Sequence, residues 1–215
     1  PTCGVAINTS YDTDSRELTI TPRIKSNTAS VYRYLVMLVE DGIVTQQYGV
    51  TGDYTHNNVV RAVLSDNIYG ARFNGGATLV QGVDTPLSAP IKFTLASNWK
   101  QENMRVVVSA MSTSDGGKSY YCNNTNQCKV GQSVGYSIES EGGDDNTQTA
   151  DVAFNRHVSV FEFTGTWCAM CPSGYVFLKY LIEDWWSHET VHILAFHDST
   201  EDDPMGIPVT NTIFN

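Results

Sequence analysis

Long hydrophobic runs are absent from this chain of 215 residues. No apolar stretch approaches the roughly 20 residues of a membrane-spanning helix, so no transmembrane segment is predicted. The chain has no internal repeat, and it opens with Pro1-Thr2-Cys3 rather than with a basic and apolar leader. Such a start is what we expect of an exported protein whose leader has been removed.

Positive charge is scarce and unevenly distributed. The chain has 13 Lys and Arg against 23 Asp and Glu, for a net charge of −10. Residues 1–140 contain 11 of each class, whereas residues 141–215 contain 2 basic and 12 acidic residues. This balance argues against a nucleic-acid-binding surface, and the change near residue 140 indicates a domain boundary.

The first part of the sequence, residues 1–138, predicts a β-sandwich. Apolar residues make up 41% and charged residues only 17%, so the chain is globular, and its many Gly, Tyr, Thr and Asn favour an extracytoplasmic, β-rich protein. About eight short strand-like runs are separated by turn residues, which is typical of a sandwich. Within one of these runs, Pro22 predicts an edge strand.

Five cysteines leave at least one without a partner in the chain. Lys118–Cys122 and Cys128–Tyr136 frame a polar stretch that is predicted to be a loop. If these runs pair as a hairpin, Cys122 and Cys128 could lie opposite each other and form a structural disulfide; two free cysteines are the alternative. Cys3 would then be free, or bonded to something outside this chain.

The strongest motif is a Cys-x-x-Cys pair, Cys168 and Cys171, which follows an apolar run at His157–Phe163. Apolar residues then recur at helical spacing over Phe177–Trp185, and a second apolar run follows at Val191–Phe196. A strand, a Cys-x-x-Cys at the opening of a helix and another strand resemble the start of a thioredoxin-like fold. No cofactor is predicted.

The position of the pair at a helix start has a chemical consequence. Unpaired backbone N–H groups and the helix dipole favour a thiolate there, so Cys168 is expected to be the attacking thiol and Cys171 the resolving one. The resemblance to thioredoxin-like proteins implies that Glu162, in the preceding strand, accepts the proton of the second cysteine. A strand carboxylate that faces solvent is the alternative for Glu162.

The pair has two alternative roles. Zinc binding needs two further ligands at short spacing, and His188, His192 and His197 lie downstream. Trp167 and Pro172, which flank the pair, fit redox chemistry better than zinc. The other alternative is a thioredoxin-like fold in which the disulfide is only structural.

Two polar groups elsewhere are candidate sites. His56, Asn57 and Arg61 stand in an apolar context in the first part, where they could bind a ligand or form a hydrogen-bond network that holds a loop. The acidic residues between 198 and 203 lack the glycine and the spacing of a calcium-binding loop. No metal site is predicted.

These pieces together resemble a family of Bacteroidetes surface lipoproteins, the relatives of a twenty-eight-kilodalton outer-membrane protein. The shared stretches are Phe161–Pro172, Phe196–Asp198, Asp203–Met205, Val39–Ile43, His56–Arg61 and Cys128–Gly131. The resemblance implies an exported protein that a lipid anchor outside this chain holds at the outer membrane or cell surface. It also implies a thioredoxin-like domain with an accessory β-domain.

The predicted fold class is α+β and multidomain. A β-sandwich over residues 1–138 is followed by an acidic Gly- and Asp-rich linker over 139–152 and a partial thioredoxin-like domain over 153–215. The second half of that fold, with its cis-proline loop, is not in this chain. A strand–helix–strand unit alone leaves a sheet edge and an apolar helix face uncovered, so another segment or a second chain is expected to complete it.

Two functions follow from the sequence. The first is thiol–disulfide oxidoreductase chemistry on protein thiols, with Cys168, Cys171, Glu162 and Trp167 as the catalytic group. The second is a surface adhesin or binding protein, in which the sandwich contacts a surface ligand and the Cys-x-x-Cys disulfide is structural. The reduction potential of the pair distinguishes them.

Overall fold

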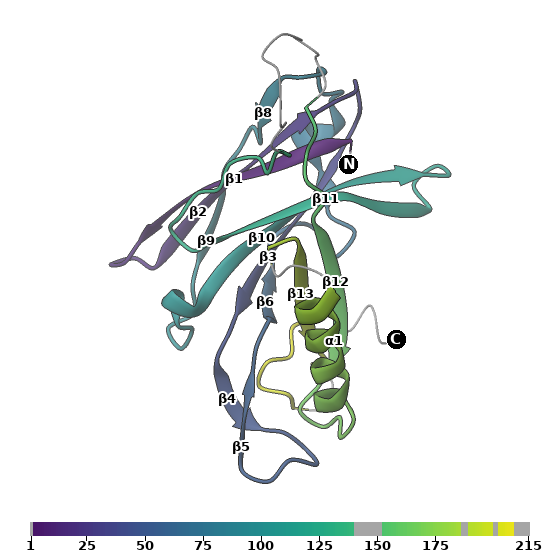
Figure 1. Ribbon diagram of the computed structural model, residues 1–215. Helices are drawn as coiled ribbons and strands as arrows, with labels where there is room; N and C mark the ends of the chain where they lie inside the picture. The colour runs from purple at the N-terminus through teal and green to yellow at the C-terminus, as the bar shows by residue number, and fades with distance from the viewer. Residues whose placement is uncertain (1, 140–151, 186–188, 200–201, 209–215) are drawn as a thin grey trace.

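A computed structural model describes residues 2–139, 152–185, 189–199 and 202–208 (Figure 1). The chain is mainly β, with one α-helix in the described part. The strands are β1 (Cys3–Asp12), β2 (Glu17–Ser26), β3 (Arg33–Glu40), β4 (Ile43–Gln46), β5 (Asp53–His56), β6 (Val59–Val63), β7 (Ala71–Arg72), β8 (Asp84–Pro86), β9 (Ile91–Thr94), β10 (Met104–Ser114), β11 (Ser119–Lys129), β12 (Val158–Thr164) and β13 (Val191–His197). The helices are α1 (Cys171–Trp185) and the short 3-10 turns η1 (Phe73–Gly76) and η2 (Gln101–Asn103).

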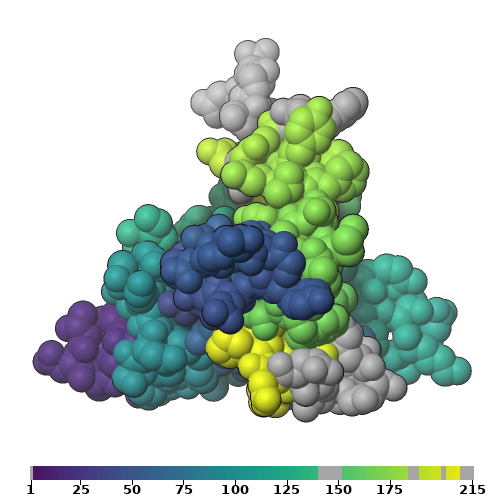
Figure 2. Space-filling view, turned by 90° about the horizontal axis from the view of Figure 1, so that it is seen from below, coloured from purple at the N-terminus to yellow at the C-terminus, as the bar shows by residue number. Residues whose placement is uncertain are grey.

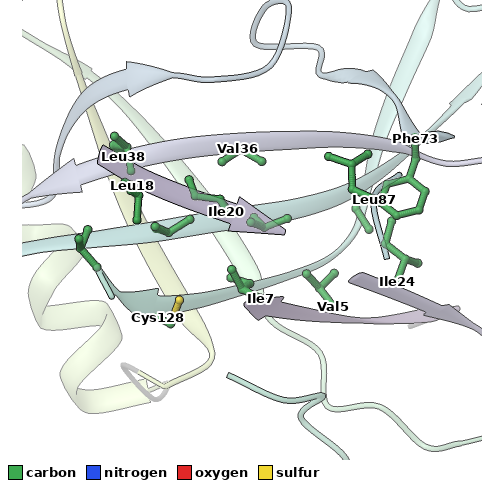
Figure 3. Close-up of a cluster of buried hydrophobic side chains, with 14 of the residues drawn as sticks. Val5, Ile7, Leu18, Ile20, Ile24, Val36, Leu38, Phe73, Leu87 and Cys128 are labelled. Atoms are coloured by element: carbon green, nitrogen blue, oxygen red, sulfur yellow. The ribbon is translucent and has the colours of Figure 1, made fainter. Parts of the chain in front are cut away.

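Two sheets pack against each other around the main hydrophobic core (Figure 3). The first has the order β1-β2-β8, with β9 also paired to β2. The second has seven strands in the order β11-β10-β3-β6-β13-β12, with β7 on β3. Because side chains alternate along a strand, Leu18, Ile20 and Ile24 of β2 are fully buried between the sheets. Val36 and Leu38 of β3 face them from the second sheet.

A second core lies on the opposite face of the seven-stranded sheet and joins the two parts of the chain. Met37 and Val39 of β3, which alternate with the residues of the first core, pack with Leu194 and Phe196 of β13. Strand β13 runs parallel to both β12 and β6. The strand–helix–strand segment around the Cys-x-x-Cys is therefore attached to the first part of the chain through β6.

Strands from both sides of the predicted linker thus share one sheet. Residues 140–151 of that linker lie outside the described residues. At its borders the chain is held together, because the Glu139 N–H donates to the Ala153 carbonyl at 2.8 Å. The division of the chain into separate domains stays a prediction.

The predicted hairpin that would bring Cys122 and Cys128 together is wrong. Both cysteines lie in one continuous strand, β11, which pairs with β10, and both are free. The polar stretch between them is not a loop because its amides bond to neighbouring backbone: Asn124 donates to the Cys3 carbonyl and Asn126 to the Val5 carbonyl. Cys3 is a free thiol, fully buried in the main core.

The prediction of an edge strand at Pro22 is also wrong, but the proline still interrupts pairing. Strand β2 has β1 on one side and two short strands on the other. Strand β9 pairs with residues of β2 up to Ile20, and β8 pairs with β2 from Arg23 onward. The gap between them falls at Pro22, which has no N–H to donate to a ladder.

Helix α1 leaves much of its apolar surface exposed. Val176, Phe177 and Tyr180 are 63%, 61% and 56% exposed, whereas Ile182 is buried. The exposure of Phe177 agrees with the expectation that an apolar face of this helix is left uncovered in the strand–helix–strand unit; the side chain of Trp185 lies outside the described part. Strand β12 is an edge of the sheet within the described residues. In the same part of the chain, no helix is long and apolar enough to cross a membrane.

Candidate functional site

The Cys168–Cys171 disulfide closes at the first residue of α1, with Cα atoms 5.5 Å apart. Both cysteines are half-buried, and the neighbouring Trp167 is 44% exposed. A tight turn after β12 leads into the pair, held by the Cys168 N–H donating to the Gly165 carbonyl at 3.0 Å. A side chain at position 165 would clash with the Trp167 ring, since a Cβ there would lie 2.4 Å from the indole nitrogen.

The β4–β5 hairpin of the first part reaches across to this turn (Figure 2, blue against green). The Tyr48 N–H donates to the Thr166 carbonyl at 2.7 Å. The side-chain amide of Gln47 donates to the Cys168 carbonyl at 2.7 Å and to the Gly165 carbonyl at 3.3 Å. Gln47 is buried, so these bonds are shielded from water and join the hairpin firmly to the disulfide turn.

A small cavity of about 20 Å³ lies behind the disulfide, between the hairpin and the sheet. It is large enough for one water molecule. The C-terminal part contributes Glu162, Thr164, Cys171, Pro172, Tyr175, Ala195 and His197, and the hairpin side contributes Gln47, Tyr54, His56 and Asn57. The cavity therefore brings together one cysteine of the pair and the predicted acid.

Glu162 is the strongly perturbed acid of this cavity. Burial raises the pKa of its carboxyl to about 7, because the charged form loses hydration. The pKa of the Tyr54 hydroxyl is also raised, mainly because Tyr54 is itself partly buried and to a lesser extent because of the nearby Glu162 charge. The alternative of a fully solvent-facing carboxylate is not what the structure has, since Glu162 is half-buried and lines the cavity.

A buried hydrogen bond between His197 and Asp203 supports the wall of the cavity. His197 Nδ1 lies 2.9 Å from Asp203 Oδ2, and the same oxygen accepts the Thr166 N–H at 2.7 Å. The other oxygen of Asp203 accepts the Met205 N–H at 2.9 Å. Burial alone would raise the pKa of Asp203, but the bonds from His197 and the two backbone groups hold it below its ordinary value. Asp203 thus ties the disulfide turn to β13.

The predicted polar cluster of the first part is divided by the structure. His56 and Asn57 line the cavity with Glu162 and Cys171. Arg61 does not: its guanidinium lies 3.3 Å from the carboxylate of buried Glu40 and stacks over the ring of partly buried Trp99.

Two of the three histidines downstream of the pair bond to other residues. His197 bonds to Asp203, and His192 Nε2 lies 3.2 Å from His157 Nδ1. His188 lies outside the described residues. No group of three metal-ligating side chains occurs in the described part of the chain.

Sequence reasoning missed Gln47, Tyr54, His197 and Asp203 as parts of this site. His197 and Asp203 lie in Phe196–Asp198 and Asp203–Met205, two of the stretches that carry the family resemblance. That resemblance is the one sequence signal for these two residues as part of the site. Nothing in the local sequence marks Gln47 or Tyr54, because their relation to the cysteines exists only in the folded chain.

Comparisons with known proteins give one family and one solved structure. HBP35 of Porphyromonas gingivalis is similar with a TM-score of 0.47 and 13% sequence identity; the match covers 71% of this chain and 50% of HBP35. The chain therefore spans about half the length of that protein. The search of curated proteins found no match. The family described as Outer membrane protein Omp28 matches residues 2–134, which is more than half of the chain. This chain accordingly belongs to the Omp28 family of outer membrane proteins and is extracytoplasmic, as the resemblance implied.

Proposed function

We propose that this outer membrane protein exchanges disulfides with protein thiols through Cys168 and Cys171, with Glu162 as the proton carrier. The observation that supports this most is the cavity that Cys171 and Glu162 line together. A structural disulfide needs no such arrangement, whereas a resolving cysteine needs a group that takes and returns its proton.

The proposed reaction balances as follows. A substrate thiolate attacks Cys168 Sγ, which forms a mixed disulfide and breaks the Cys168–Cys171 bond. Cys171 leaves as a thiolate and takes a proton from protonated Glu162 through the cavity. A second substrate thiolate then attacks the substrate sulfur and releases Cys168 as a thiolate. The substrate dithiol is oxidised, the pair is reduced, and in reverse Glu162 accepts the Cys171 proton.

The electrostatics favour a moderate potential. A carboxyl with a pKa of about 7 is well matched to proton transfer near neutral pH. The start of α1 favours a thiolate at the pair, but no Lys or Arg lines the cavity among the described residues. A strongly oxidising pair needs more thiolate stabilisation than this, so its potential should resemble those of thioredoxin or disulfide isomerases.

A groove lies beside the turn that leads into the disulfide. This groove of about 620 Å³ runs between the hairpin tip, Tyr48–Gly52, and Thr166, Trp167 and Pro204. Tyr48 is 69% exposed, so aromatic surface borders the groove on both walls. A substrate segment bound in this groove would contact the disulfide turn without moving the residues that line the small cavity.

The test is the redox equilibrium of the pair. The protein is equilibrated in glutathione buffers, quenched with acid, alkylated and measured by mass spectrometry. We expect Cys168 and Cys171 to open together, with a midpoint between about −270 and −180 mV. A midpoint below about −300 mV would instead identify a structural disulfide. Cys122→Ser is the matched control: Cys122 is an exposed free thiol, and its loss should leave the midpoint unchanged.

One observation favours the second candidate function, a surface adhesin or binding protein. Val176, Phe177 and Tyr180 expose an apolar face on α1, and β12 is an edge strand within the described residues. A missing segment or second chain that completes the sheet would cover this face. Resistance of the disulfide to the glutathione buffers would leave binding as the leading function.

A further inference from the structure

His56 lines the cavity but has no role in the exchange as described above. Its side chain is buried, with 6% of the residue exposed, and its Nε2 has no hydrogen-bond partner among the described residues. A buried polar atom without a partner is unfavourable, so it calls for an explanation. His56 lies on β5, far from Cys171 in the sequence and inside the Omp28 match.

His56 lines the cavity, and we expect its Nε2 to find a partner there. Its ring contacts Tyr54 and His197, with centroids 4.8 Å and 5.4 Å away. His197 is already bonded to Asp203. The remaining titratable groups that line the cavity are Glu162, Tyr175 and Cys171.

His56 is neutral under ordinary conditions. Burial, with the neighbouring His197, lowers the pKa of its imidazole to about 4, while Asp203 and the Gln46 backbone act in the opposite direction. A neutral imidazole near Glu162 does not titrate between about pH 5 and 8, where the acid does. It can hydrogen-bond to a water molecule without changing charge.

We propose that His56 is a positioning residue for thiol exchange, whose Nε2 orients the single water that carries the proton between Cys171 and Glu162. This rests on the proposed function. The cavity has room for one water, and a bridging water needs two to four polar partners. The Glu162 carboxyl, the Cys171 sulfur and His56 Nε2 supply three. The Omp28 part would then be a component of the thiol site as well as its support.

Three substitutions separate this role from a structural one. His56→Gln keeps a polar group that can donate or accept a hydrogen bond close to the position of Nε2, and His56→Met has a similar length without that group. His56→Phe keeps the ring contacts with Tyr54 and His197. If the Phe variant does not fold, the comparison of Gln with Met still decides.

The reduced protein is mixed with glutathione disulfide, quenched in acid at set times and analysed by mass spectrometry. Formation of the mixed disulfide reports attack by Cys168, and its loss reports resolution by Cys171. We expect His56→Met and His56→Phe to slow the resolution step roughly tenfold or more near neutral pH, while the rate of attack by Cys168 changes little. His56→Gln should keep most of the resolution rate of the parent protein. In His56→Met and His56→Phe, the apparent pKa of the pH profile of the resolution rate should differ from that of the parent.

Each outcome decides the question. The role of His56 would be overturned if His56→Met and His56→Phe resolved the mixed disulfide as fast as the parent does. It would also be overturned if His56→Gln were as slow as His56→Met. Either result would leave the exchange function standing. A parent protein that forms no mixed disulfide and cannot be reduced by glutathione would overturn the exchange function, and the role of His56 with it.

Discussion

Replacement of Glu162 by Gln should stabilise the protein at high pH and have little effect at low pH. Burial raises the pKa of this carboxyl from 4.5 to about 7. The folded state binds the Glu162 proton more tightly than the unfolded chain does. The contribution of this proton to the free energy of unfolding is therefore fully present below pH 4.5 and is lost as the pH rises through 7. Glutamine fills the same space without ionising, so it removes that loss.

The magnitude follows from the shift. A change of one pKa unit corresponds to about 1.4 kcal/mol, so the full shift corresponds to about 3 kcal/mol; partial exposure of Glu162 to solvent reduces this to about 2 kcal/mol. We therefore expect the variant to gain about 2 kcal/mol relative to the parent between about pH 5 and pH 8.5.

Guanidinium unfolding of the oxidised protein at several pH values measures this difference. The control is Glu183→Gln on α1, whose side chain is 49% exposed and lies 3.6 Å from Lys179. Its effect should stay within about 0.5 kcal/mol at every pH. A stability difference for Glu162→Gln that does not vary with pH would refute the reasoning, because it would mean that the carboxylate is as well hydrated in the folded protein as in the unfolded chain.

Two further stability predictions concern other buried groups. Burial, with the neighbouring His157 as a lesser cause, lowers the pKa of His192 to about 4, so the free energy of unfolding should fall by about 2 kcal/mol between about pH 7 and pH 5 as the unfolded chain takes up the proton more readily. His192→Leu should remove that part of the slope, measured in a Glu162→Gln background because Glu162 acts in the opposite direction over this range; an unchanged slope would count against a buried neutral His192. Gln47→Ala removes both side-chain bonds to the disulfide turn and should cost about 1 to 2 kcal/mol in denaturant unfolding, whereas Gln46→Ala, at the neighbouring position of the hairpin, is the control and should cost less.

Local chemistry was readable from the sequence wherever it depends on neighbours in the chain. The strand, turn and helix around Cys168 and Cys171 follow from hydrophobic periodicity and from the Cys-x-x-Cys spacing, and the structure contains each element and the disulfide. The hairpin of β1 and β2 is equally local, since its turn residues follow the first strand directly.

The same local reasoning gave the wrong structure between Cys122 and Cys128, because polar residues there lie in a strand. Asn124 and Asn126 have low strand propensity, so the stretch was predicted to be a loop. In the folded chain their amides bond to the backbone of β1 and adjoining segments, which compensates for burying them. That compensation comes from residues distant in sequence, and no local pattern reports it.

What the sequence by itself determined is therefore the disulfide motif, its position at a helix start, the strand that bears Glu162 and the membership of the Omp28 family. The tertiary structure alone decided that β13 joins β6, and that the β4–β5 hairpin crosses to the cysteines. Those two contacts bring His56 and Glu162 to one cavity. The physical reason is that parallel pairing and side-chain burial between distant segments depend on the complementarity of surfaces that exist only after each part has folded.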